Sequence, residues 1–104
     1  MTRSRIPPVA ARVITYSGKG CPWCKVFAPT FAKFAKEHPE LVCESLDVDH
    51  ATGPQIADAL KYKVSHLPTT VFVTKRGRLL FKIDGARSLS QLNLALKLIP
   101  LKYQ

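Results

Sequence analysis

Hydrophobic and polar positions change their spacing several times along the chain, and each change marks a predicted element. Four short segments combine β-branched, aromatic and other apolar residues between glycine, proline or polar residues, a pattern typical of strands. They are residues 13–16, 41–48, 70–74 and 79–83. The last two are joined by the short polar segment 75–78, so we expect them to form an antiparallel hairpin.

Three other segments repeat apolar residues at the spacing of a helix. The first helix is expected over residues 24–37, where Phe27, Phe31 and Phe34 share one face and Pro29 introduces a kink. The second begins at the capping-box sequence 52–55. Its apolar face consists of Ile56, Ala57 and Leu60.

A third helix is predicted near the end of the sequence. It begins at a second capping-box sequence, residues 88–91, and we expect Pro100 to end it. Its inward residues are Leu92, Ala95, Leu96 and Ile99.

The order of these elements predicts the fold class. Strand, helix, strand, helix, strand, strand, helix indicates an α/β fold in which one central mixed β-sheet is flanked by helices. The 104 residues are enough for one compact core without metals or structural disulfides. We therefore expect a single domain over residues 1–104, with residues 1–11 as a flexible or loosely packed N-terminal segment.

The net charge of the chain indicates the chemical class of its possible partners but does not identify one. Sixteen basic and seven acidic residues give a formal net charge of +9, which in general favours acidic partners, nucleic acid or anionic surfaces. The basic residues are scattered along the chain, so a solvated surface explains them better than a nucleic-acid site does. We expect a monomer that binds neither nucleic acid nor membranes.

Cysteine content and the first residues bear on the compartment. Three cysteines are too few for a disulfide scaffold, and their odd number leaves one unpaired in any scheme. Residues 1–12 contain no continuous apolar stretch of the kind a secretory signal requires. Both features predict a reducing, cytoplasmic location.

The sequence Cys21-Pro22-Trp23-Cys24 carries the candidate chemistry, because it lies where a strand gives way to a helix. Unpaired N–H groups and the helix dipole stabilise a thiolate there, which predicts a Cys21 pKa below the usual value of about 8.5. Lys19 and Lys25 are positioned to add to that field. We assign Cys21 as the nucleophile and Cys24 as the resolving thiol, with Trp23 as an exposed surface that faces substrate.

A zinc site is the main structural alternative for a pair of this spacing. It requires two further ligands at suitable spacing, whereas Cys43, His38, His50 and His66 are isolated from one another in the sequence. We therefore expect no metal, and we expect Cys43 to be a buried small apolar residue.

Several separated motifs together resemble the thioredoxin superfamily from about residue 12 to residue 99. They are residues 21–25 for the redox motif, Pro29 in the following helix, residues 46–49 at the end of the central strand, residues 67–69 for the proline loop, and Gly85 after the last strand. The resemblance implies a thioredoxin fold in which Pro68 is cis and lies beside Cys21. It also implies that the backbone of Leu67 is presented to an extended substrate.

The sequence departs from the thioredoxin pattern in two ways. The enclosed dipeptide Pro22-Trp23 is similar to that of glutaredoxins, so we interpret the chain as a thioredoxin-like body with a glutaredoxin-like CPWC loop. Thr15 and Ser45 align with the buried carboxylate and lysine of thioredoxins. Losing both charges together is nearly neutral, whereas losing one leaves an uncompensated buried charge.

The missing carboxylate leaves the proton of Cys24 without its usual acceptor. Water, the departing substrate thiolate, or a nearby side chain such as His66 or Glu44 are the alternatives. The dipeptide Pro22-Trp23 and the missing carboxylate together predict a reduction potential less reducing than that of an ordinary thioredoxin.

Three functions are compatible with these residues. The favoured one is a thioredoxin-like reductase of protein disulfides that works by dithiol exchange through Cys21 and Cys24, needs no cofactor beyond that disulfide, and takes electrons from a thioredoxin- or glutaredoxin-type reductase system. The second is a glutathione-dependent glutaredoxin in which Cys21 alone handles glutathione mixed disulfides. The third is a basic binding module in which the cysteines are incidental.

Overall fold

A computed structural model describes residues 9–102, and its elements follow the predicted order. They are β1 (Arg12–Ser17), α1 (Pro22–Glu37), β2 (Val42–Asp47), the 3₁₀ helix η1 (Val48–His50), α2 (Gly53–Lys61), β3 (Thr69–Val73), β4 (Leu79–Asp84) and α3 (Leu89–Lys102). Of the N-terminal segment 1–11, residues 1–8 lie outside the described residues. The N–H of Ala11 donates to the carbonyl of Val73, at 2.8 Å, directly before β1.

As predicted, the four strands form one mixed sheet, and their order in it is β2-β1-β3-β4. Strand β1 is parallel to β2 and antiparallel to β3, and β3 and β4 form the expected antiparallel hairpin. In the β1–β2 register Thr15 is level with Ser45, and Ser17 is level with Asp47. Because strand side chains alternate between faces, these four residues point to the same side of the sheet.

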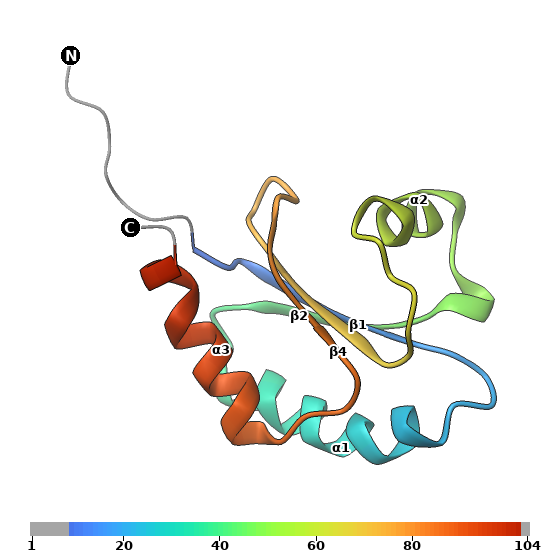
Figure 1. Ribbon diagram of the computed structural model, residues 1–104, viewed down its shortest axis with the longest axis horizontal. Helices are drawn as coiled ribbons and strands as arrows, with labels where there is room; N and C mark the ends of the chain where they lie inside the picture. Colours follow the sequence, from blue (N-terminus) through green and yellow to red (C-terminus); the bar gives the residue numbers. More distant parts are fainter. Residues whose placement is uncertain (1–8, 103–104) are drawn as a thin grey trace.

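That side of the sheet is covered by α1 and α3, which contact each other (Figure 1). Phe27, Phe31 and Phe34 of α1 are buried there, and the ring of Phe34 meets the edge of Phe72 with centroids 6.3 Å apart. The four predicted inward residues of α3 pack in the same core. Helical spacing therefore predicted the buried faces of both helices correctly.

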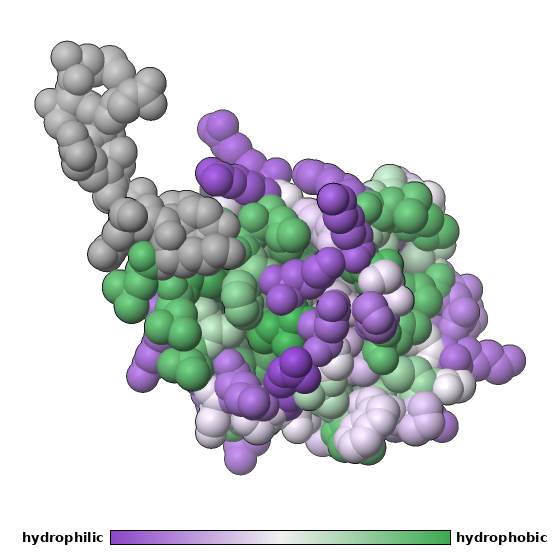
Figure 2. Space-filling view, in the orientation of Figure 1, coloured by the Kyte–Doolittle hydropathy of each residue, from purple (hydrophilic) through white to green (hydrophobic). Residues whose placement is uncertain are grey.

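The opposite side of the sheet is covered by α2 (Figure 1). Ile14, Tyr16 and Leu46 from the sheet form a second core with Tyr62, and Ala59 of α2 packs against it. The three residues of the apolar face predicted for α2 (Ile56, Ala57 and Leu60) are all exposed, Ile56 at 47 % and Leu60 at 73 %. Figure 2 shows the resulting hydrophobic surface over α2.

The helix ends confirm both capping boxes and correct one boundary. The side chain of Gln55 accepts from the N–H of Thr52 at 2.9 Å, and Ser88 and Gln91 make the same reciprocal pair at the start of α3. The prediction that Pro100 ends α3 is wrong, since the helix continues to Lys102. A proline so close to the C-terminal end has helical φ and removes only one ladder hydrogen bond, so the last turn persists.

Candidate active site

Cys21 and Cys24 lie at the junction of β1 and α1 and are joined by a disulfide with their Cα atoms 5.3 Å apart. Gly20 has a φ of +74°, which turns the chain into the helix, and Pro22 occupies the first helical position, where no N–H is needed. Cys21 is the N-cap residue, and the N–H of Cys24 donates to its Sγ at 3.2 Å. The chain therefore directs the donors of a helix N-terminus at the Cys21 sulfur.

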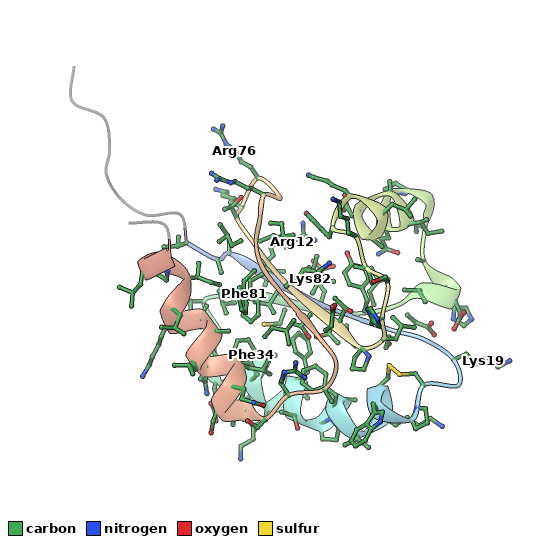
Figure 3. All side chains as sticks on the ribbon, in the orientation of Figure 1. Arg12, Lys19, Phe34, Arg76, Phe81 and Lys82 are labelled. Atoms are coloured by element: carbon green, nitrogen blue, oxygen red, sulfur yellow. A yellow bond between two sulfur atoms is a disulfide. The ribbon has the colours of Figure 1, made fainter. Side chains whose placement is uncertain are left out.

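The two sulfurs differ in their access to solvent. Cys24 is buried, with 8 % of its surface exposed, while Cys21 is half-buried at the rim of the site. The disulfide is visible in Figure 3 at the end of α1 nearest the loop that carries Lys19. A partner disulfide can therefore reach Cys21 while Cys24 stays shielded.

Beside the pair runs a groove of about 260 Å³ that is lined by Trp23, Leu67, Pro68, Gly85 and Ala86. The Leu67–Pro68 peptide bond is cis, as predicted, and Pro68 is buried. Trp23 is 65 % exposed, and its ring forms one wall of the groove. The structure thus brings Trp23 together with Leu67 and Pro68, which lie far from it in the sequence.

Behind Cys24 lies a second cavity, of about 350 Å³. Thr15 and Ser45 both line it. Thr15 is only 4 % exposed, and its hydroxyl shares a hydrogen bond of 3.0 Å with the hydroxyl of Thr70. The side chain below the disulfide is therefore neutral and already has a polar partner.

Asp47 and His50 line the same cavity, and sequence reasoning missed them. His50 Nδ1 lies 3.0 Å from Asp47 Oδ2, while Asp47 Oδ1 accepts the N–H of Asp49 at 2.9 Å. A hydrogen bond from the Asp49 N–H lowers the pKa of Asp47 below its usual value, and the hydrogen bond with the His50 side chain lowers it further. The available signal was the position of Asp47 two residues after Ser45, because alternation along β2 puts both on the Cys24 side.

The predicted modulating lysines lie near the site in different ways. Lys25 follows Cys24 on α1, and it lines the cavity behind Cys24 together with Lys19. The Lys19 side chain extends away from the disulfide (Figure 3), while its backbone N–H donates to Asp49 Oδ2 at 2.6 Å.

Neither predicted proton acceptor lies in that cavity. His66 is exposed beyond the groove, where its Nδ1 lies 3.0 Å from Ser65 Oγ and 3.7 Å from Asp84 Oδ2. The suggestion that Glu44 accepts the Cys24 proton is wrong. Glu44 pairs with Arg12 on the α2 side of the sheet, where Arg12 Nε donates to its carboxylate at 3.2 Å. The sheet separates Glu44 from Cys24, because neighbouring residues on a strand point to opposite faces.

Among residues 9–102, no three or more His, Cys, Asp or Glu side chains gather as metal ligands. Nor does any helix in that range have the length and apolar character needed to cross a membrane.

Cys43, the third cysteine, is half-buried against the core under α1, and burial raises the pKa of its thiol.

Comparison with known sequences identifies the family. Residues 8–97 match the Thioredoxin family, which is nearly the whole chain. The chain belongs to the thioredoxin family. Among its relatives are Thioredoxin H5 of Arabidopsis thaliana, 36 % identical over 71 % of this chain, and Thioredoxin-2 of Saccharomyces cerevisiae, 33 % identical over 71 %. The matched segments span 58 % and 66 % of those two thioredoxins.

A solved thioredoxin structure has the same fold. The thioredoxin of Fasciola hepatica superposes with a TM-score of 0.70 at 26 % sequence identity, over 92 % of this chain and 84 % of that one. The thioredoxin fold predicted from the resemblance is thereby confirmed.

Proposed function

We propose that this thioredoxin-family protein is a thiol–disulfide oxidoreductase that reduces protein disulfides by dithiol exchange. The observation that carries the proposal is the Cys21–Cys24 disulfide at the N-terminus of α1, with the more accessible sulfur beside an open groove. Membership of the thioredoxin family supports it. An incidental cysteine pair has no reason to be placed at such a junction.

The reaction follows from the positions of the two sulfurs. The Cys21 thiolate attacks one sulfur of the substrate disulfide, forms a mixed disulfide and expels the other substrate sulfur as a thiolate. Cys24 then attacks Cys21 Sγ, which releases the second substrate thiol and leaves Cys21 and Cys24 oxidised to their disulfide. Two electrons pass from the protein to the substrate in each cycle.

The helix N-terminus is what makes Cys21 the attacking sulfur. The Cys24 N–H already points at Cys21 Sγ at 3.2 Å in the disulfide, so the same donor is in place when the thiolate forms. The helix dipole adds a favourable field at the same point. Lys25, exposed on the first turn of α1, contributes positive charge nearby.

The groove accounts for the substrate class. Trp23 and Pro68 offer apolar walls to an extended peptide segment, and the backbone of Leu67 is available for main-chain hydrogen bonds. A folded protein with an exposed disulfide, or an unfolded chain, fits such an open surface better than a small substrate that needs enclosure.

The proposed function also includes a source of electrons and a cellular location. The Cys21–Cys24 pair carries the electrons, and a thioredoxin- or glutaredoxin-type reductase system regenerates it after each turnover. The protein acts as a monomer in the cytoplasm, a reducing compartment that suits the free thiol of Cys43.

Two assays on wild type and Cys21→Ser test the proposal. Reduction of insulin disulfides coupled to thioredoxin reductase is expected from wild type and is expected to vanish in Cys21→Ser. Cys43→Ser, matched in chemistry but outside the site, is the control and keeps wild-type activity. Activity restricted to a glutathione mixed disulfide would replace the proposal with a glutaredoxin function, and no activity in either assay would favour a binding module.

The reduction potential of the Cys21–Cys24 pair provides a second test. With neutral Thr15 below Cys24 and Pro22-Trp23 between the sulfurs, we expect a value less reducing than the ~−270 mV of an ordinary thioredoxin. Equilibration against a glutathione buffer measures it. A value at or below about −270 mV would contradict this expectation.

A further inference from the structure

One step of the proposed reaction still lacks a residue: the removal of the Cys24 proton. Cys24 must lose its proton to attack the mixed disulfide, because the thiolate is the nucleophile. Thr15, the side chain aligned with the usual carboxylate, is a neutral hydroxyl that is already bonded to Thr70. Glu44 lies on the other face of the sheet, and His66 lies outside the cavity.

We propose that His50, held by Asp47, accepts the proton of Cys24 through water in the cavity of about 350 Å³ that Cys24, Asp47 and His50 line together. This assignment rests on the proposed oxidoreductase function. The cavity is open to solvent at the His50 side, where the imidazole is 84 % exposed. It is lined with polar groups and is large enough for several waters.

The Asp47 carboxylate fixes the orientation of the imidazole. With Nδ1 of His50 at 3.0 Å from Asp47 Oδ2, the ring places its proton on Nδ1 and leaves Nε2 as the acceptor. Asp47 is itself held by the Asp49 N–H at 2.9 Å. Asp47 is therefore a positioning residue, and its negative charge stabilises the imidazolium once the proton has arrived.

The step balances in protons and electrons. The Cys24 proton moves through water to His50 Nε2 as Cys24 Sγ forms its bond to Cys21 Sγ. The bond between Cys21 Sγ and the substrate sulfur breaks, and the substrate leaves as a thiolate. The imidazolium then gives its proton to that thiolate or to solvent, which returns His50 to its neutral form.

The other charged groups around the cavity are unsuitable acceptors. Lys19 and Lys25 line it, but they are cationic and have no lone pair to offer while protonated. Asp49 uses Oδ2 to accept the N–H of Lys19 at 2.6 Å, on the Gly18 side of the loop. Asp47 is occupied by the Asp49 N–H and by His50.

The reaction of the reduced protein with Ellman's reagent isolates the step. The Cys21 thiolate releases a first thionitrobenzoate and forms a mixed disulfide, and attack by Cys24 releases the second, so stopped-flow absorbance resolves two phases. In wild type we expect the second phase to slow as pH falls through the range in which histidines become charged, pH 5 to 8. His50→Gln is expected to slow it about tenfold at pH 7 and to leave only the pH dependence that the ionisation of Cys24 itself produces.

Two further variants separate a proton-transfer role from a structural one. Imidazole added to His50→Ala is expected to restore the second phase in proportion to its concentration, which repair of a merely structural defect would not do. Asp47→Asn is expected to slow the second phase about threefold, because the hydrogen bond persists and the charge is lost. His38→Gln, at the far end of α1, is the matched control and keeps the wild-type rate.

The phases also separate the failure of this assignment from the failure of the proposed function. If His50→Gln keeps the wild-type rate and pH profile of the second phase, the Cys24 proton goes to bulk solvent and the assignment is wrong, while the oxidoreductase function stands. If wild type itself releases no second thionitrobenzoate, both are contradicted. The first phase is expected to be the same in wild type and all variants, since Cys21 depends on the N-terminus of α1.

Discussion

The two faces of the sheet are covered very differently. On one face α1 and α3 enclose a core of aromatic and aliphatic side chains that extends from Phe27 to Ile99. On the other face α2 contributes no buried residue, and its side chains Ile56 and Leu60 are exposed. The sheet therefore has a sealed face, on which two helices close the core beyond the cavity behind Cys24, and a thin face, on which one helix without buried residues lies over the second core.

The sealed face is the one that positions the chemistry. Cys24, Phe27, Phe31 and Phe34 are the buried residues of α1, so the same stripe that anchors the helix also holds the resolving cysteine. Burial of this stripe fixes the direction of the helix N-terminus relative to β1. Precise placement of Cys21 thus depends on packing against the α1–α3 face.

Substituting one leucine on each face gives the largest contrast. Leu92→Ala removes a fully buried side chain on α3 and is expected to lower the free energy of unfolding by about 2–5 kcal/mol. Leu60→Ala, on α2, is expected to change it by at most about 0.5 kcal/mol. Urea unfolding followed by circular dichroism measures both, and equal losses would show that the faces contribute equally.

Thr15→Asp probes the sealed face from inside the sheet. Ser45, level with Thr15, supplies no positive charge, so a carboxylate at this buried position is uncompensated and is expected to cost about 3 kcal/mol at pH 7. Burial would raise the pKa of that carboxyl, so stability is lost as pH rises through its unfolded value and is recovered in acid. Unfolding at pH 4 and pH 7 tests this, and an equal cost at both would contradict it.

Tyr62→Phe probes the thin face. The Tyr62 hydroxyl donates to the carbonyl of Gly77 at 2.6 Å and ties the end of α2 to the β3–β4 hairpin. Removing it is expected to lower the free energy of unfolding by about 1 kcal/mol. Thermal unfolding provides the measurement, and a loss as large as that of Leu92→Ala would mean that the thin face depends on this single contact.

The smallest predicted effect concerns the alkylation rate of Cys43 and not the stability of the protein. Burial raises the pKa of its thiol, so less thiolate is present at pH 8 than in a free cysteine, and alkylation is slower. Iodoacetamide applied to the reduced protein is therefore expected to label Cys21 first and Cys43 faster as pH rises. Peptide mass spectrometry follows both, and equal rates at pH 8 would contradict the burial of Cys43.

The sealed face could be predicted from the sequence because periodicity alone specifies it. Phe27, Phe31 and Phe34 fall on one stripe of α1, and the inward residues of α3 fall on another. The redox motif and Pro68 also occupy the places that the family resemblance implies.

The remaining features depend on contacts that periodicity does not specify. An apolar stripe on α2 shows that the helix has an apolar face, but not that another element of the chain covers it. Glu44, one of the side chains considered as a proton acceptor, faces the other side of the sheet, and alternation with Ser45 could have excluded it. The Asp47–His50 pair forms because η1 turns His50 back toward the end of β2, a turn that no sequence motif announced.

Dithiol exchange depends most directly on the separate roles of Cys21 and Cys24. When the reduced Cys24→Ser variant is treated with a disulfide-bonded protein substrate, it is expected to accumulate a mixed disulfide at Cys21, which mass spectrometry of the linked peptides identifies. Cys21→Ser is expected to form none. A stable mixed disulfide at Cys24 in Cys21→Ser, or none in Cys24→Ser, would contradict the proposed exchange.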